Sequence, residues 1–137
     1  MAKVINLSEA ASLAIHSMAL IAGSKIKLNV GNIAAITGAS RNHLAKVLQT
    51  LVRHDYLISD RGPKGGFELK HDASQITLLE IYQTMEGIID RNYCGLHGTT
   101  CPFAECVFGG LTQYFTNDFV NYMQTKKLSS IAYKTQI

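Results

Sequence analysis

All three cysteines of this 137-residue chain lie within thirteen residues, in the stretch YCGLHGTTCPFAEC. Cys94, Cys101 and Cys106 are spaced C-x6-C-x4-C, and two glycines separate the first two. Thiolates are soft ligands that suit iron–sulfur clusters and zinc, and glycines let a loop bring three sulfurs toward one point. An odd cysteine count argues against a disulfide framework and favours metal binding or redox chemistry.

Three kinds of chemistry stay open for this cysteine segment. An iron–sulfur cluster, [2Fe–2S] or [4Fe–4S], is the first, because the Cys101-Pro102 step is typical of some ferredoxins. A zinc site is the second, although the cysteines of structural zinc sites usually come in C-x2–4-C pairs. Three free thiols that act as a redox sensor without any metal are the third.

The composition is that of one small globular domain, with 47% hydrophobic and 17% charged residues. The N-terminal apolar stretch is interrupted by Glu9 and His16, which favours an amphipathic helix over a signal peptide. No apolar run is long enough to cross a bilayer, so we expect a cytoplasmic protein without a membrane partner. The chain contains no glycine-rich phosphate loop and no Ser-His-Asp order, which argues against an enzyme.

The charge of the chain is unevenly distributed. Residues 1–71 contain nine Lys/Arg and four Asp/Glu, whereas residues 72–137 contain four Lys/Arg and six Asp/Glu. A basic N-terminal half is either a solvated face or the binding surface for a polyanion such as DNA. The local pattern must decide between these two interpretations.

The pattern of the first half predicts a helix-turn-helix. Ser8 can cap a helix that runs to about Ala22, and a short helix is expected around residues 33–36. The turn Thr37-Gly38-Ala39 then leads to Ser40, which caps a longer helix with apolar residues at helical spacing. A short helix, a glycine-containing turn and a longer helix are the parts of this motif.

The second half of the pattern adds a wing and a long helix. Strands are expected at 56–59 and 67–69, with the Gly- and Pro-rich turn 60–66 between them. A helix is expected to follow at 78–85 and to end at Gly87, and a long last helix at 103–125 with an apolar stripe that a partner helix would cover. We therefore predict a mainly α fold with a small β-hairpin wing: a winged helix-turn-helix DNA-binding domain at 1–75, then a cluster-binding loop and dimerisation helix at 76–137, in one compact chain.

Polar residues at the start of the second helix of such a motif face the base edges of the major groove. Here Arg41 could read guanine and Asn42 adenine, whereas Thr50 and Arg53 would sooner touch phosphate. A basic wing tip can enter an adjacent minor groove. The alternative is that these residues only cap and solvate the helix and the turn. The candidate DNA-binding residues are Ser40, Arg41, Asn42, His43, Lys46, Arg61 and Lys64.

Two segments carry a family resemblance. GASRNHLAKVLQTLVRHDYLISDRGPKGGFEL and DASQITLLEIYQTME, followed by clustered cysteines ahead of a long helix, resemble the Rrf-type (IscR/NsrR-like) bacterial transcription regulators. The resemblance runs from about Leu7 to Ile131, and its wing motif RGPKGGFEL is the most specific part. It implies a homodimer paired through the long helix and a palindromic double-stranded DNA operator. It also implies that Arg61 enters the minor groove and that residues 40–46 read the major groove.

The resemblance further implies that the three cysteines hold an iron–sulfur cluster. The spacing C-x6-C departs slightly from the C-x5-C that is common in the family, and Gly109 stands where some relatives have a histidine ligand. Others take ligands from the first helix of the other subunit, which makes His16 the first candidate. His97, inside the cysteine loop, is the second candidate and Glu9 the third.

The resemblance thus predicts a dimeric regulator, expected to be a repressor. Its operator affinity would be switched by a cluster that senses nitric oxide, redox state or iron supply. The SRNHL segment points toward nitric oxide. The alternatives are a cluster-free or zinc-binding thiol regulator of the same fold and, more remotely, an iron–sulfur electron-transfer protein.

Overall fold

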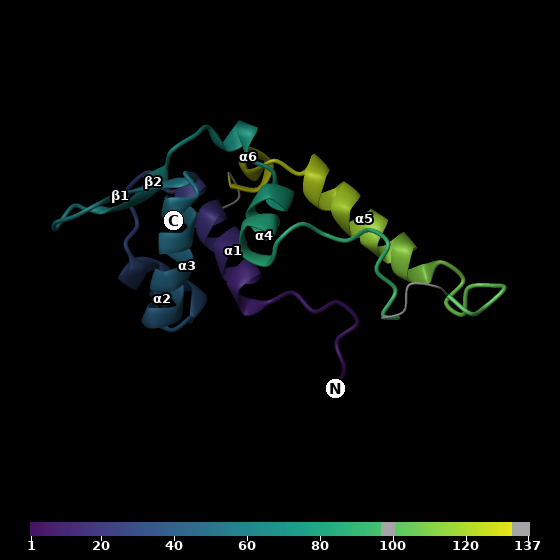
Figure 1. The fold of residues 1–137 in the computed structure, drawn as a ribbon. Coiled ribbons are helices and arrows are strands. Elements are labelled where there is room, and N and C mark those ends of the chain that lie inside the picture. Colours follow the sequence, from purple (N-terminus) through teal and green to yellow (C-terminus); the bar gives the residue numbers. More distant parts are fainter. Residues whose placement is uncertain (97–100, 133–137) are drawn as a thin grey trace.

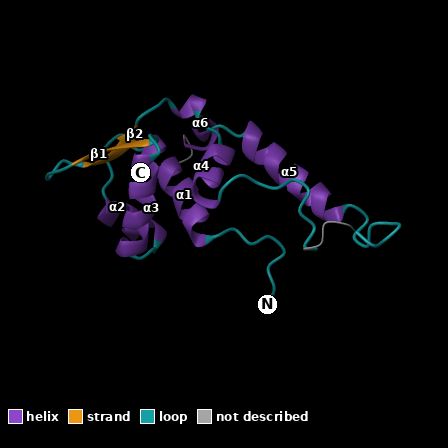
Figure 2. Ribbon diagram, viewed as in Figure 1, coloured by secondary structure: helices purple, strands orange, loops and turns teal. Residues whose placement is uncertain are grey.

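The computed structural model describes residues 1–96 and 101–132. In this part of the chain, six α-helices and a 3-10 turn accompany one two-stranded sheet, which confirms the mainly α fold with a β-hairpin (Figures 1 and 2). No helix among these residues is both long enough and apolar enough to cross a bilayer. The elements are α1 (Glu9–Gly23), α2 (Val30–Thr37), α3 (Arg41–Arg53), β1 (Leu57–Asp60), β2 (Gly66–Leu69), the 3-10 turn η1 (Ala73–Gln75), α4 (Leu78–Glu86), α5 (Leu111–Thr125) and α6 (Leu128–Ala132).

Side-chain caps fix where the helices start. Ser8 Oγ accepts a hydrogen bond from the Ala11 N–H at 3.0 Å, and Ser40 Oγ accepts one from the His43 N–H at 3.1 Å. Each bond satisfies one of the backbone donors that a helix leaves unpaired at its start. The caps at Ser8 and Ser40 confirm the predicted starts of α1 and α3.

The hairpin is joined by a third, short piece of chain. Its antiparallel register pairs Leu57 with Leu69 and Asp60 with Gly66. Leu28 forms a bridge to Phe67 on the other side of β2, where the Phe67 N–H donates to the Leu28 carbonyl at 2.8 Å. The segment before α2 therefore anchors the base of the wing.

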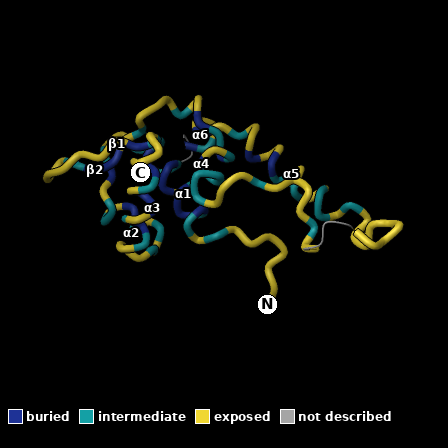
Figure 3. The backbone as a smooth tube through the Cα atoms, in the orientation of Figure 1, coloured by how far each residue is buried: buried dark blue, intermediate teal, exposed yellow. Residues whose placement is uncertain are grey.

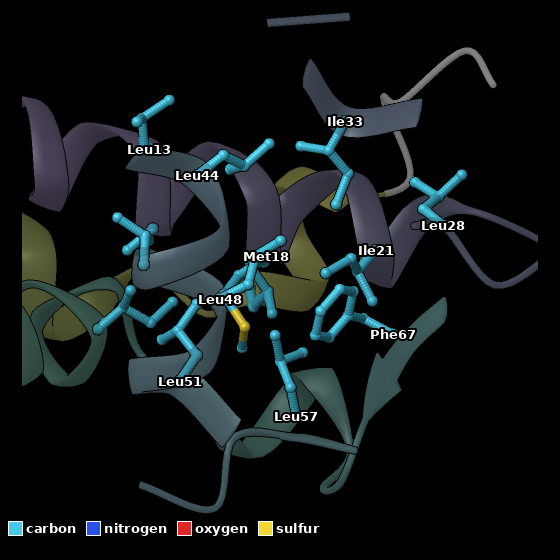
Figure 4. Close-up of a cluster of buried hydrophobic side chains, with 14 of the residues drawn as sticks. Leu13, Met18, Ile21, Leu28, Ile33, Leu44, Leu48, Leu51, Leu57 and Phe67 are labelled. Carbon is cyan, nitrogen blue, oxygen red and sulfur yellow. The ribbon is translucent and has the colours of Figure 1, made fainter. Parts of the chain in front are cut away.

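Helix α1 lies at the centre of the molecule and packs against α3, α4 and α6 (Figures 1 and 3). The buried side chains of α1 and α3 meet those of the hairpin in one cluster, in which Met18, Leu48 and Leu57 are almost fully buried (Figure 4). Ile81 and Leu128 belong to the same cluster, so the segment after residue 75 shares its core with the segment before it. The division of the chain at residues 75 and 76 stays a prediction.

The last long helix begins later than the sequence predicted. The expectation of a helix from Phe103 is wrong, because α5 starts at Leu111 and the residues before it form turns. Gly109 and Gly110 have φ angles of 60° and 78°, in the left-handed region that ends or precedes a right-handed helix. The segment that carries the last cysteine is therefore a loop.

Helix α6 is an element that the sequence did not predict. After α5 the chain bridges Thr77 through Lys127, and the Leu128 N–H donates to the Ile76 carbonyl at 2.8 Å. This pairing with a distant segment ends α5 and turns the chain back, so that Leu128 is buried beside α1.

Ser17 on α1 is a buried polar residue whose hydroxyl lacks a hydrogen-bond partner in the described part of the chain. A buried hydroxyl without a partner loses its hydration and gains nothing in return. We expect Ser17→Ala to raise the free energy of unfolding by about 1 kcal/mol, measured by urea denaturation. Ser12→Ala, on the same helix but only half-buried, is the control and should change it by less than about 0.5 kcal/mol. Destabilisation by Ser17→Ala would mean that the hydroxyl is bonded.

Candidate nucleic-acid interface and cysteine segment

The first turns of α3 bring together the polar residues that the sequence singled out for base contacts. Ser40, Arg41, Asn42 and Lys46 are exposed, and His43 is half-buried. The opposite face of α3 is held in the core by Leu44, Val47, Leu48 and Leu51. The packing of the apolar face therefore orients the polar face outward.

Further along α3 the same outward face is hollowed. A hollow of about 380 Å³ is lined by Ala45, Lys46, Gln49, Thr50 and Arg53. An Arg53 Nη2 donates to Thr50 Oγ at 3.2 Å, and Thr50 Oγ donates to the Lys46 carbonyl at 2.9 Å. Gln49 was not predicted, although its position seven residues after Asn42 on a helix would have placed it on this face.

Two side chains of this surface touch neighbouring helices. A Cβ at Gly31 would lie 2.9 Å from an Nη of Arg41, so the Arg41 guanidinium rests against the first turn of α2. His43 Nδ1 lies 3.4 Å from an Oε of Glu9 at the start of α1. The base-reading candidates are therefore in contact with both α1 and α2.

The wing extends from the body at the left of Figure 1 and carries Arg61 and Lys64, both exposed, between its strands. Glycines are required at its base. A Cβ at Gly66, where φ is 152°, would lie 2.7 Å from the Leu28 carbonyl oxygen. A Cβ at Gly65 would lie 2.5 Å from the backbone carbonyl oxygen of Asp60. The close backbone approach explains the GG pair of the wing motif.

The cysteine segment lies beyond the start of α5, at the end of the molecule opposite the wing (Figure 1). Cys94 is half-buried and Cys101 and Cys106 are exposed, and all three are free thiols. Cys106 Sγ accepts a hydrogen bond from the Gly110 N–H at 3.4 Å. The N–H groups of Gly110 and then Phe108 lower the pKa of the Cys106 thiol, which favours the thiolate that metals bind.

The donor chemistry fits a soft metal, but the described part of the chain does not bring the three cysteines within reach of one metal ion. Among the described residues, no group of three His, Cys, Asp or Glu side chains lies close enough together to hold a metal ion. His16 is exposed on α1, where its Nδ1–H donates to the Ser12 carbonyl at 2.7 Å. That bond leaves Nε2 as the free ligand atom. His97 lies outside the described residues, and Glu9 contacts His43 instead of a cysteine.

Helix α5 leaves an apolar face uncovered in the single chain. Leu111, Tyr114, Phe115 and Tyr122 are between 47% and 64% exposed. A hollow of about 460 Å³ lies between this helix, α4 and the N-terminal residues 4–7. Exposed large apolar side chains gathered on one helix are typical of a site of protein association.

Two helices with a glycine turn, followed by a hairpin with a basic tip, make a winged helix-turn-helix, a fold class that binds DNA. The chain belongs to the Rrf2 family, whose model, described as an iron-dependent transcriptional regulator, matches residues 7–134. This confirms the resemblance drawn from the sequence. Members of the family are transcriptional regulators, so the expectation that the chain is no enzyme is also confirmed.

Solved structures confirm the fold. CymR (YrzC), the global cysteine regulator of B. subtilis, superimposes with a TM-score of 0.79 at 18% identity, covering 97% of this chain and all of that one. IscR of T. potens superimposes with a TM-score of 0.73 at 16% identity, covering 97% of this chain and 90% of that one. At these identities the likeness concerns the fold alone.

A sequence relative is similar over half of the chain. The HTH-type transcriptional regulator BadM of Rhodopseudomonas palustris is 40% identical over 67 residues. The match covers 49% of this chain and 43% of BadM, so the chain spans less than half the length of that relative.

Proposed function

We propose that the chain is a dimeric transcriptional repressor whose affinity for a palindromic DNA operator is switched by an iron–sulfur cluster held by Cys94, Cys101 and Cys106. The observation that carries the proposal is the set of three free thiols on one loop, with Cys106 Sγ held by backbone N–H groups. The description of the family as iron-dependent supports it. A protein that binds chromosomal DNA would work in the cytoplasm.

In this proposal α3 and the wing contact different grooves of the DNA. Arg41, Asn42 and Lys46 meet the major groove, with Ser40 and His43 beside them, and Arg61 and Lys64 meet the adjacent minor groove. Their exposure on one side of well-packed elements supports these roles. A second copy that covers the apolar face of α5 would give the symmetry that a palindromic operator requires.

The cysteines supply three ligands, and His16 of the other subunit is our first candidate for the fourth. Its Nε2 is free because its Nδ1–H is bonded to the Ser12 carbonyl. His97 is the second candidate and Glu9 the third. When bound, a cluster supplies a group that reacts with nitric oxide or oxygen and responds to iron supply. Thiolate ligands suit it because they are soft donors.

The chain offers a route from the cysteine segment to α3. Helix α4 ends at Glu86 and leads into Cys94, and the Ser8 hydroxyl at the start of α1 donates to the Glu86 carboxylate. The next residue, Glu9, contacts His43 on α3. We propose that a change in the cysteine segment moves the end of α4, and that α1 passes the change to α3. The effect on DNA affinity is then the difference in free energy between the two states.

The second candidate function is a regulator of the same fold that uses its thiols directly or through zinc. The exposed free thiols favour it. Among the similar structures, CymR is described as a global cysteine regulator and one CymR structure as an oxidized form. An electron-transfer protein is less well supported, because the family consists of regulators.

An absorption spectrum of protein purified without oxygen tests the proposed cofactor, with iron, sulfide and zinc assayed on the same sample. We expect visible charge-transfer bands together with matching amounts of iron and sulfide. A protein that stays colourless after anaerobic reconstitution would contradict the cluster. Zinc in the colourless protein would support a zinc regulator, and no metal would support free thiols.

A further inference from the structure

Lys27, just before α2, contacts two carboxylates of the wing. Its Nζ donates to Oδ2 of Asp60 at the end of β1 and lies 3.8 Å from an Oε of Glu68 on β2. About a third of the Lys27 side chain is exposed, and roughly half of each carboxylate side chain. The bond to Asp60 raises the pKa of Lys27, so the ammonium stays charged throughout the physiological range.

The backbone explains why these three groups meet. Leu28 bridges Phe67, and both side chains are buried beneath the hairpin. Side chains alternate along paired strands, so the preceding residue Lys27 lies on the outer face, opposite Glu68. Glu68 pairs with Ile58 on β1. Asp60 follows Ile58 by two residues on the same strand, so its side chain lies on the same outer face. The contact is therefore built into the register of the wing.

The charges of the wing make this contact relevant to DNA. Residues 57–69 carry Arg61 and Lys64 but also Asp60 and Glu68, so their net charge is zero. Asp60 directly precedes Arg61, the residue proposed to enter the minor groove. A carboxylate at that place repels the phosphates that the arginine must approach. Lys27 also shares a hollow of about 560 Å³ with Pro63 and Lys64, which places its charge beside the basic tip.

We infer that Lys27 is a positioning residue for DNA binding: it neutralises Asp60 and Glu68 and holds the wing so that Arg61 and Lys64 can approach the phosphate backbone. The inference rests on the proposed DNA interface. Lys27 acts through the two carboxylates and not by contacting DNA itself.

The test measures the affinity of each variant for one fluorescent duplex. The duplex has the sequence that the wild-type protein selects from a random-sequence library. Lys27→Met keeps the aliphatic stem and should weaken binding by about tenfold, because two carboxylates then face the phosphates unpaired. In an Asp60→Asn, Glu68→Gln background, the same substitution should change the affinity by less than about twofold. Lys27→Arg, which keeps the charge, should bind within about twofold of wild type.

Lys25→Met is the matched control, because it removes the same charge two residues earlier, where no described residue forms an ion pair with it. It should change the affinity by less than about twofold. Thermal unfolding of each variant monitors the fold. If Lys27→Met fails to fold, Lys27→Gln replaces it in both backgrounds with the same expected results, because it also removes the charge and keeps part of the stem.

Two results would overturn the inference. An equal loss with Lys27→Met in both backgrounds, with a salt slope reduced by about 0.9, would mean that Lys27 binds a phosphate directly. An equal loss with Lys25→Met would mean that only net charge matters. Arg61→Ala in the same assay separates the two proposals. If Arg61→Ala leaves the affinity unchanged, the proposed DNA interface itself is wrong. If Arg61→Ala weakens binding and Lys27→Met does not, the interface stands and only the proposed role of Lys27 is wrong.

Discussion

Arg61→Ala is expected to weaken operator binding by about 10- to 100-fold. Arg61 is exposed at the tip of a wing that is anchored by Leu28 and needs glycine at Gly65 and Gly66. A narrow minor groove concentrates negative potential on an inserted arginine. Arg61 therefore contributes most of its binding free energy only when the wing reaches that groove. The measurement is fluorescence anisotropy with the selected duplex over a series of salt concentrations.

Arg91→Ala is the control for Arg61→Ala. It removes the same charge from an exposed residue that follows α4 in the chain, three residues before Cys94 and outside both α3 and the wing. It should leave the affinity within about twofold of wild type. If both variants bind as wild type does, the wing lies outside the interface. If both weaken binding equally, the protein binds DNA through its overall charge.

Loss of any one of the three cysteines is expected to remove most of the bound iron. Cys94→Ala, Cys101→Ala and Cys106→Ala each delete one of the three thiolates that we propose as cluster ligands, and three are already fewer than the four that a cluster usually needs. Because the thiols lie outside the packed core, each variant should unfold within about 1 kcal/mol of wild type. The measurement is iron and sulfide per chain after anaerobic reconstitution, with DNA affinity before and after nitric oxide.

The three single variants also separate the candidate functions. A cluster needs all three thiolates, so all three variants should lose both iron and the response to nitric oxide. A thiol pair that forms a disulfide needs only two, so one of the three variants would keep its response to oxidants. An unchanged response in all three variants would mean that the cysteines are not the sensor.

The helix-turn-helix could be predicted because its signals are local. Ser8 and Ser40 each cap the helix that follows, and each cap acts within three residues. The base-contact candidates on α3 follow from the same local pattern, since the apolar stripe of a helix also fixes its polar face. Gln49 belongs to the same face but lies beyond residues 40–46, to which the prediction of base contacts was confined.

The parts that were wrong or missed depend on particular backbone angles or on contacts between distant residues. Helix α5 starts at Leu111 because Gly109 and Gly110 adopt left-handed backbone angles, which a run of apolar residues does not reveal. Helix α6 exists because Lys127 pairs with Thr77, fifty residues away. Similarly, no local pattern indicates that Lys27 meets Asp60 and Glu68.

Residue types alone predict part of the cysteine site. The three thiols and their chemistry are evident from the sequence, and the structure adds the backbone donors that favour the Cys106 thiolate. The fourth ligand is not evident, because His16 lies far from the cysteines in sequence and would come from another subunit. Its identity depends on an assembly that one chain does not contain.

The most direct test of the central proposal is the DNA affinity of one anaerobic, iron-loaded sample, measured before and after the metal is removed by a chelator. We expect the two affinities to differ by about tenfold or more, and the Cys106→Ala variant to show one affinity under both conditions. Equal affinities for the loaded and the metal-free wild-type protein would contradict it. The chain would then be an Rrf2-family regulator whose cysteines do not control its binding to DNA.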